Sequence, residues 1–220
     1  MIPLVRYTVA VMVHSQRFLP PVLLFVIGMG TFAHDAGTEP VVQIVAPMTA
    51  VAFVAAAWLT VALATAEDPV QRAITAVNTG RSWPQLVAVV LVVLATFLVL
   101  VVVLLALPIV LGNRGAGVME LVVGALSLLT GAAFGAAVGL PTSRLVIRRA
   151  GFALLATFVL LLVFLLIRGL PPVNSLVMLL TEEGTEPADM LLPELAYLLL
   201  TAAVLAGSVA ATHTIVTRRD

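Results

Sequence analysis

Six long apolar stretches, separated by short polar segments, set the strongest limit on how this chain can fold. A helix crosses a hydrocarbon core about 30 Å thick with about 20 apolar residues, because each residue advances the helix by about 1.5 Å. The six stretches cover residues 19–33, 41–65, 85–111, 118–140, 151–168 and 195–216. We therefore predict an all-α, polytopic membrane protein in which residues 1–220 form a single transmembrane domain with six spans.

The composition excludes a water-soluble protein and several kinds of active site. The chain is 62% hydrophobic and 10% charged, whereas soluble domains carry about 25% charged residues. It has no cysteine for disulfides or thiolate metal sites, and no lysine for an ATP-binding phosphate loop. The histidines are isolated near span ends, and neither Gly-x-Ser-x-Gly nor His-Glu-x-x-His occurs, so we predict no catalytic residue, metal site or cofactor. The net charge of zero gives no sign of nucleic-acid binding.

Arginine placement predicts the orientation, because cytoplasmic loops of membrane proteins carry an excess of basic residues. If both termini are cytoplasmic, only Arg114 and Arg168 face outward. The inward-facing arginines are then Arg6, Arg17, Arg72, Arg81, Arg144, Arg148, Arg149, Arg218 and Arg219. The complete replacement of lysine by arginine is typical of a GC-rich bacterial genome. We therefore predict a multi-pass protein of the bacterial plasma membrane with both termini inside.

The longest polar interruption in the first half of the chain, residues 66–84, contains the pattern of a short helix. Asp68 is a good N-cap and Pro69 a good first residue. Apolar residues then recur at helical spacing along one face, with polar residues on the other. The predicted contact residues of this helix are Val70, Gln71, Arg72, Ala73, Ile74 and Val77. Two interpretations are open: a helix that rests on lipid headgroups, or a coupling helix that binds a groove in a cytosolic partner.

Two further segments are neither spans nor simple loops. Residues 1–18 form a weakly amphipathic segment, which we interpret as an interfacial helix. Residues 169–194 contain an apolar run, Val173 to Leu180, that is too short to cross the membrane, and a second patch, Met190 to Leu192. These short runs predict a hairpin that re-enters the outer leaflet. The alternative is an outer loop with hydrophobic residues packed on the bundle.

The order of these elements resembles the membrane subunit of type-2 ABC exporters. That pattern is an interfacial helix, two spans, a cytoplasmic coupling helix, four further spans, and a short re-entrant pair before the last span. The stretch "TAEDPVQRAITAVNTGRSWPQL" is similar to the coupling segment of that family. The resemblance implies that Val70 to Val77 bind a separate cytosolic ATPase, which would hold ATP and Mg, and that two permease copies pair. A homodimer is expected, with a related permease as the alternative partner.

Small residues recur at four-residue spacing in two of the predicted spans. Gly131, Gly135 and Gly139 lie in the fourth span, and Ala203 and Gly207 lie in the sixth. Such rows allow close approach of helix backbones in lipid. They predict either packing within the subunit or a face of the dimer or translocation pathway.

The predicted span interiors contain no charged residue, and Glu120 lies at the boundary of the fourth span. Since intramembrane charges mark ion pathways, this pattern disfavours ion-coupled transport. The leading hypothesis is a permease subunit of an ATP-driven exporter for a lipid-like, amphipathic or antibiotic-type substrate. The alternatives are an ATP-independent channel or small-solute transporter, and a structural or regulatory membrane protein.

Overall fold

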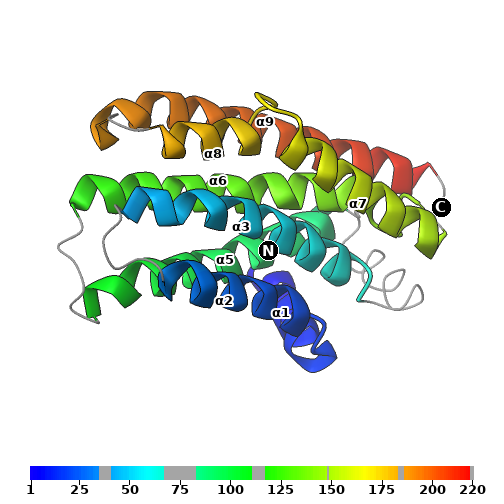
Figure 1. Ribbon diagram of the computed structural model, residues 1–220. Coiled ribbons are helices and arrows are strands. Elements are labelled where there is room, and N and C mark those ends of the chain that lie inside the picture. Colours follow the sequence, from blue (N-terminus) through cyan, green and yellow to red (C-terminus); the bar gives the residue numbers. More distant parts are fainter. Residues whose placement is uncertain (35–40, 67–82, 111–116, 148, 183–185, 219–220) are drawn as a thin grey trace.

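The computed structural model describes residues 1–34, 41–66, 83–110, 117–147, 149–182 and 186–218. Within these ranges every regular element is an α-helix and no strand occurs, which confirms the predicted all-α class. The helices, labelled as in Figure 1, are α1 (Ile2–Ser15), α2 (Leu19–His34), α3 (Val41–Ala64), α5 (Trp83–Val110), α6 (Val118–Thr142), α7 (Ala150–Leu166), α8 (Val173–Thr181) and α9 (Pro187–Thr217).

Three helices that run in the same direction, α3, α6 and α9, form the centre of the bundle (Figure 1). Helix α6 lies in the middle and packs against α3 on one side and α9 on the other. Helices α2 and α5 complete the core beside them, and their rings Phe25 and Phe97 meet edge to face with centroids 5.7 Å apart. The main hydrophobic cluster therefore sits between α2, α3, α5 and α6.

The N-terminal helix turns sharply into the second helix. Gln16 has a φ of 53° and ends α1 in the left-handed conformation, and α1 and α2 then meet at 80°. Helix α1 packs against α5. The Arg17 guanidinium donates a hydrogen bond of 3.2 Å to the Thr65 carbonyl oxygen. The elbow between α1 and α2 is thus held against the end of α3.

Helices α7 and α8 together run the length of the bundle, with a break between them. The rings of Phe164 in α7 and Phe53 in α3 lie 6.4 Å apart, and Val173 of α8 is buried in the same cluster. Because Phe53 lies midway along α3, α7 ends and α8 begins at the middle of the bundle. From there α8 continues toward the end where α9 begins (Figure 1).

The break between α7 and α8 follows from residues that cannot continue a helix. Gly169 has a φ of 74°, which favours glycine, and Pro171 and Pro172 have no amide hydrogen to donate. The side-chain amide of Asn174 stabilises the turn through both its oxygen and its nitrogen. It accepts a 2.9 Å hydrogen bond from the Gly169 amide and donates one of 2.9 Å to the Leu165 carbonyl oxygen.

Several apolar helices indicate a membrane protein. Among the described helices, α3, α6, α9 and residues Trp83–Ala106 of α5 are long and apolar enough to cross a bilayer. The bent pair α1–α2 adds a fifth candidate when it is counted as one span, and α7 is a shorter apolar helix. By length and composition alone, the described helices thus support four or five spans and do not confirm the six predicted from the sequence.

The structure differs from the prediction between residues 169 and 194. The second apolar patch, Met190 to Leu192, is not a separate arm of a hairpin, because α9 is continuous from Pro187 to Thr217. Helix α9 thus begins eight residues before the predicted last span, 195–216. Pro193 and Glu194 interrupt the apolar run and therefore suggest a boundary before the last span. The helix nevertheless continues through both residues.

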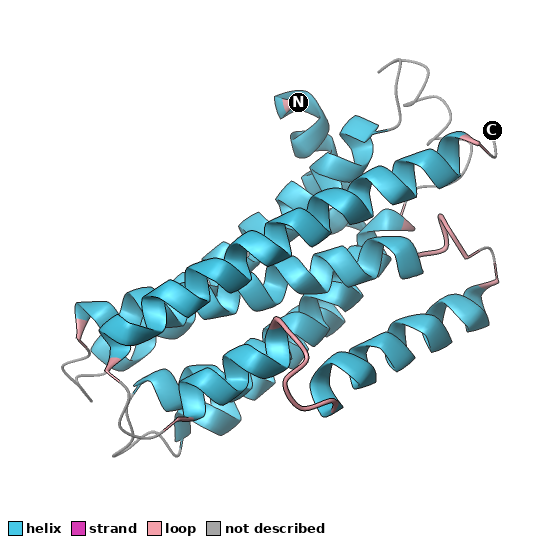
Figure 2. Ribbon diagram, turned by 90° about the horizontal axis from the view of Figure 1, so that it is seen from above, coloured by secondary structure: helices cyan, strands magenta, loops and turns pink. Residues whose placement is uncertain are grey.

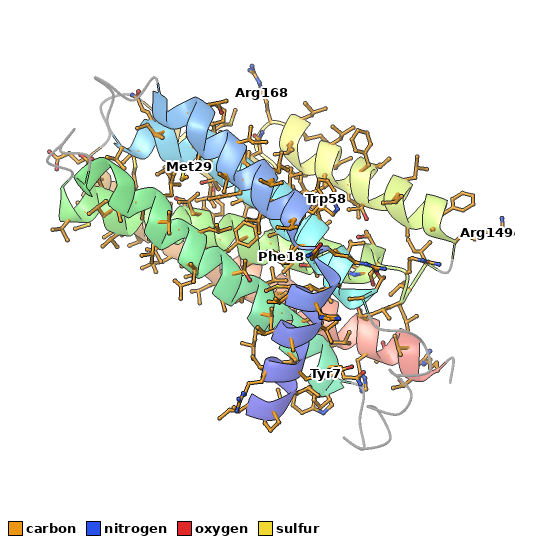
Figure 3. All side chains as sticks on the ribbon, turned by 90° about the horizontal axis from the view of Figure 1, so that it is seen from below. Tyr7, Phe18, Met29, Trp58, Arg149 and Arg168 are labelled. Atoms are coloured by element: carbon orange, nitrogen blue, oxygen red, sulfur yellow. The ribbon has the colours of Figure 1, made fainter. Side chains whose placement is uncertain are left out.

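Four of the six described arginines lie at one end of the bundle. The end of α3, the start of α5, the end of α6, the start of α7 and the end of α9 lie together in Figure 1. Arg17, Arg144, Arg149 and Arg218 belong to these ends, whereas Arg168 lies in the break after α7, at the other end of that helix (Figure 3).

Candidate functional site

The glycines of α6 form a seam with α3 in which backbone touches backbone. A Cβ atom added at Gly131 would lie 2.7 Å from the Thr49 carbonyl oxygen, and one at Gly139 would lie 2.7 Å from that of Ala57. At Gly135 it would collide with the Phe53 carbonyl oxygen and lie 2.9 Å from the Ala57 nitrogen. These distances leave no room for a side chain, so the four-residue spacing on α6 matches a four-residue row of carbonyls on α3.

The second row of small residues lies elsewhere. Ala203 and Gly207 in α9 are exposed, and a Cβ atom at Gly207 would meet nothing within 4 Å. This row therefore faces away from the other described helices. It makes no packing contact with them at Gly207.

A line of polar residues runs along the face of α9 that meets α6. Glu194, Thr201 and Ser208 recur every seven residues, which returns to the same face after two turns. The Ser208 hydroxyl donates a 2.7 Å hydrogen bond to the Ala137 carbonyl oxygen of α6. Farther along, the Ser127 hydroxyl of α6 donates to the Glu194 carboxyl oxygen Oε1. These two bonds define a polar seam between α6 and α9.

Several buried hydroxyls near this seam have no hydrogen-bond partner. In α3 and α7, Thr49, Thr60 and Thr157 donate to the carbonyl four residues earlier, at 2.7 to 3.0 Å. By contrast, Oγ1 of Thr130, Thr201 and Thr212 is buried without a partner among the described residues, as is Oε2 of Glu194. Unsatisfied buried polar atoms are uncommon in folded proteins. The polar seam is therefore where this bundle has unused hydrogen-bonding capacity.

Glu194 is the functional candidate that the sequence analysis missed. The sequence predicts that Glu194 belongs to the outer segment, residues 169–194, and that the span interiors contain no charged residue. The structure instead places it inside α9, fully buried. Its hydrogen-bond partner, Ser127, lies 67 residues earlier in the sequence. No local pattern in the sequence indicates that Glu194 is buried inside a helix.

The predicted coupling residues, Val70, Gln71, Arg72, Ala73, Ile74 and Val77, lie outside the described residues. The described helices that flank this segment are α3 and α5. Trp83 at the start of α5 is exposed, as is Trp58 near the end of α3, which Figure 3 labels. Tryptophan rings are enriched at membrane–water boundaries.

The described part of the chain contains no group of three or more His, Cys, Asp or Glu side chains that could hold a metal ion.

The fold thus defines an all-helical chain of membrane-protein character with two interhelical seams, one of glycines and one of polar residues. Comparisons with protein-family models, curated proteins and solved structures found no match to this chain.

Proposed function

We propose that this chain is the permease subunit of an ATP-driven exporter, with the six spans and the inside orientation predicted from the sequence. A separate cytosolic ATPase binds residues Val70 to Val77, and a second permease copy completes the translocation pathway. The substrate is lipid-like, amphipathic or of an antibiotic type, because the helices offer aliphatic walls with few aromatic rings.

The observation that carries this proposal is the position of α8. A short helix between the fifth apolar helix and the last one is part of the predicted order, and α8 occupies this position. Leu176 and Leu180 of α8 are buried, and the helix packs mainly on α3, a candidate span. An outer loop lying on the end of the bundle would not reach the middle of α3. The bent α1–α2 pair gives further support, since a helix at 80° to its neighbour suits the membrane surface.

Co-purification tests the proposal. The chain should be purified from native membranes without overexpressed partners. We expect an ATPase with a Gly-x-x-x-x-Gly-Lys-Ser/Thr loop to accompany it, with two copies of each subunit in the complex. Substrate transport by proteoliposomes that contain this chain alone, at the rate of native vesicles, would contradict the proposal.

A labelling experiment tests the depth of α8. The chain has no native cysteine, so single cysteines can be introduced without background. Leu176 is unsuitable because it is fully buried against protein, whereas Met178 is 43% exposed on the outer face of α8. If this face meets lipid, Met178→Cys should react at least tenfold more slowly with a membrane-impermeant maleimide than Glu182→Cys, which caps the same helix. Equal rates, measured with both membrane faces accessible, would place α8 in water.

Glu194 favours a second candidate, an ATP-independent transporter driven by an ion gradient. A buried carboxylate inside an apolar helix is typical of ion and proton pathways. The two candidates differ in their energy source. Transport by proteoliposomes of the purified chain, driven by a pH gradient in the absence of ATP, would favour the second candidate.

A further inference from the structure

Glu194, at one end of the polar seam, forms fewer hydrogen bonds than its two carboxyl oxygens could accept. The Glu194 side chain is fully buried, and Ser127 donates to its Oε1 atom. Its Oε2 atom is buried and without a partner among the described residues. A carboxyl group in this setting lacks the two or more donors that an ionised carboxylate needs on burial.

Glu194 also lies well inside its helix. It is seven residues after Pro187, so it sits about 10 Å along α9. The neighbouring Met190 is almost fully buried in the main hydrophobic cluster. Water at the end of the bundle therefore does not solvate this carboxyl in the conformation described here.

No basic side chain faces Glu194 from the helices around it. Helices α3, α5 and α8 contain no titratable residue at all, and α6 contains only the half-buried Glu120. In α9 the titratable residues besides Glu194 are Asp189, Tyr197 and His213, and His213 is nineteen residues away, about five turns along the helix. The segments that border these helices contribute Glu182 and Glu186 between α8 and α9, and Arg168 in the break between α7 and α8; all three side chains are exposed. Among the described residues, an ionised Glu194 would thus be a buried charge without a counter-ion, which is strongly unfavourable.

We infer that Glu194 is an intramembrane proton-binding site. In this conformation its carboxyl carries a proton, and the neutral group is stable beside Ser127 in the closed seam. When α6 and α9 separate, water enters, the carboxyl is hydrated and the proton leaves. The unpartnered hydroxyls of Thr130 and Thr201 supply further polar atoms for that water. This inference goes beyond the proposed permease function and does not depend on a cytosolic ATPase.

Infrared spectroscopy of the purified chain in lipid nanodiscs tests the inference directly. At neutral pH we expect a C=O stretching band of a protonated carboxyl, which lies above the amide and carboxylate bands. Glu194→Gln should abolish this band, because it keeps the shape and polarity of the side chain without the acid. The matched control Glu120→Gln should retain it. Absence of the band in the wild-type protein, or its persistence in Glu194→Gln, would overturn the inference.

Two further measurements fix the site and its ligand. Ser127→Ala removes the hydrogen bond to the carboxyl, so the band should move to higher frequency without being lost. An unmoved band in a folded Ser127→Ala protein would contradict the assigned geometry. Sodium chloride and choline chloride should give the same spectrum. Loss of the band with sodium chloride alone would show that the carboxyl binds a metal cation in place of a proton.

Discussion

Replacing Gly135 with leucine is expected to prevent recovery of a folded, monodisperse protein from membranes. The first atom of any side chain there collides with the Phe53 carbonyl oxygen and approaches the Ala57 nitrogen. Both belong to the backbone of α3, which cannot move aside as a flexible side chain can. Even Gly135→Ala should destabilise the bundle by about 1–3 kcal/mol, the usual range for overpacking a tight core. Thermal unfolding in detergent, followed by size-exclusion chromatography, measures both effects.

Gly207 provides the matched control in the same experiment. It lies in a helix and belongs to a row of small residues, but a Cβ atom there meets nothing within 4 Å. Gly207→Leu should therefore leave the thermal stability within about 0.5 kcal/mol, the usual range for surface substitutions. If the row that includes Ala203 is a dimer face, this variant should lose the dimer and keep the fold. Equal loss of fold in both glycine variants would contradict the assignment of the α3–α6 seam.

Replacing Ile74 with aspartate is expected to abolish association with the ATPase. In the predicted helix, Ile74 shares the apolar face with Val70 and Val77, and a carboxylate on that face would be buried without a partner. Membrane insertion should be unaffected, because the segment lies outside the predicted spans. A pull-down with tagged permease, combined with substrate-stimulated ATP hydrolysis, measures the loss.

Thr75→Asp is the control for this variant. It introduces the same charge one residue away, on the polar face of the predicted helix. It should therefore retain the ATPase. Wild-type recovery of ATPase with Ile74→Asp would instead support a helix that only rests on lipid headgroups.

Hydropathy and spacing in the sequence predicted much of this fold. All six predicted spans are helical over most of their length, because an apolar run of this length has few alternatives in a bilayer. The run from Val173 to Leu180 was predicted as a short separate segment, and α8 covers Val173–Thr181. The four-residue glycine row gave two possibilities, and the structure places Gly131, Gly135 and Gly139 against α3.

The candidate site was less accessible to sequence reasoning. In a hydropathy profile, Pro193 and Glu194 mark the end of an apolar run. The profile cannot show that Ser127, 67 residues earlier, is the hydrogen-bond partner of Glu194. The position of α8 within the bundle could not be predicted from the sequence either. Only the cluster of Phe53, Phe134 and Val173 shows that α8 begins at mid-bundle and completes the path of α7.

The backbone contacts between α3 and α6 also determine which parts of the bundle can move. Side chains can change rotamer when two helices slide, but a carbonyl oxygen seated against a glycine has no such freedom. We therefore expect helices α3 and α6 to move as one rigid body. Helix α7 lies along one side of the bundle with most of its residues uncovered (Figure 2), and the turn at Gly169 separates it from α8. We therefore expect any alternation between two shapes to leave the α3–α6 pair fixed and to move helices that lack such backbone contacts, such as α7.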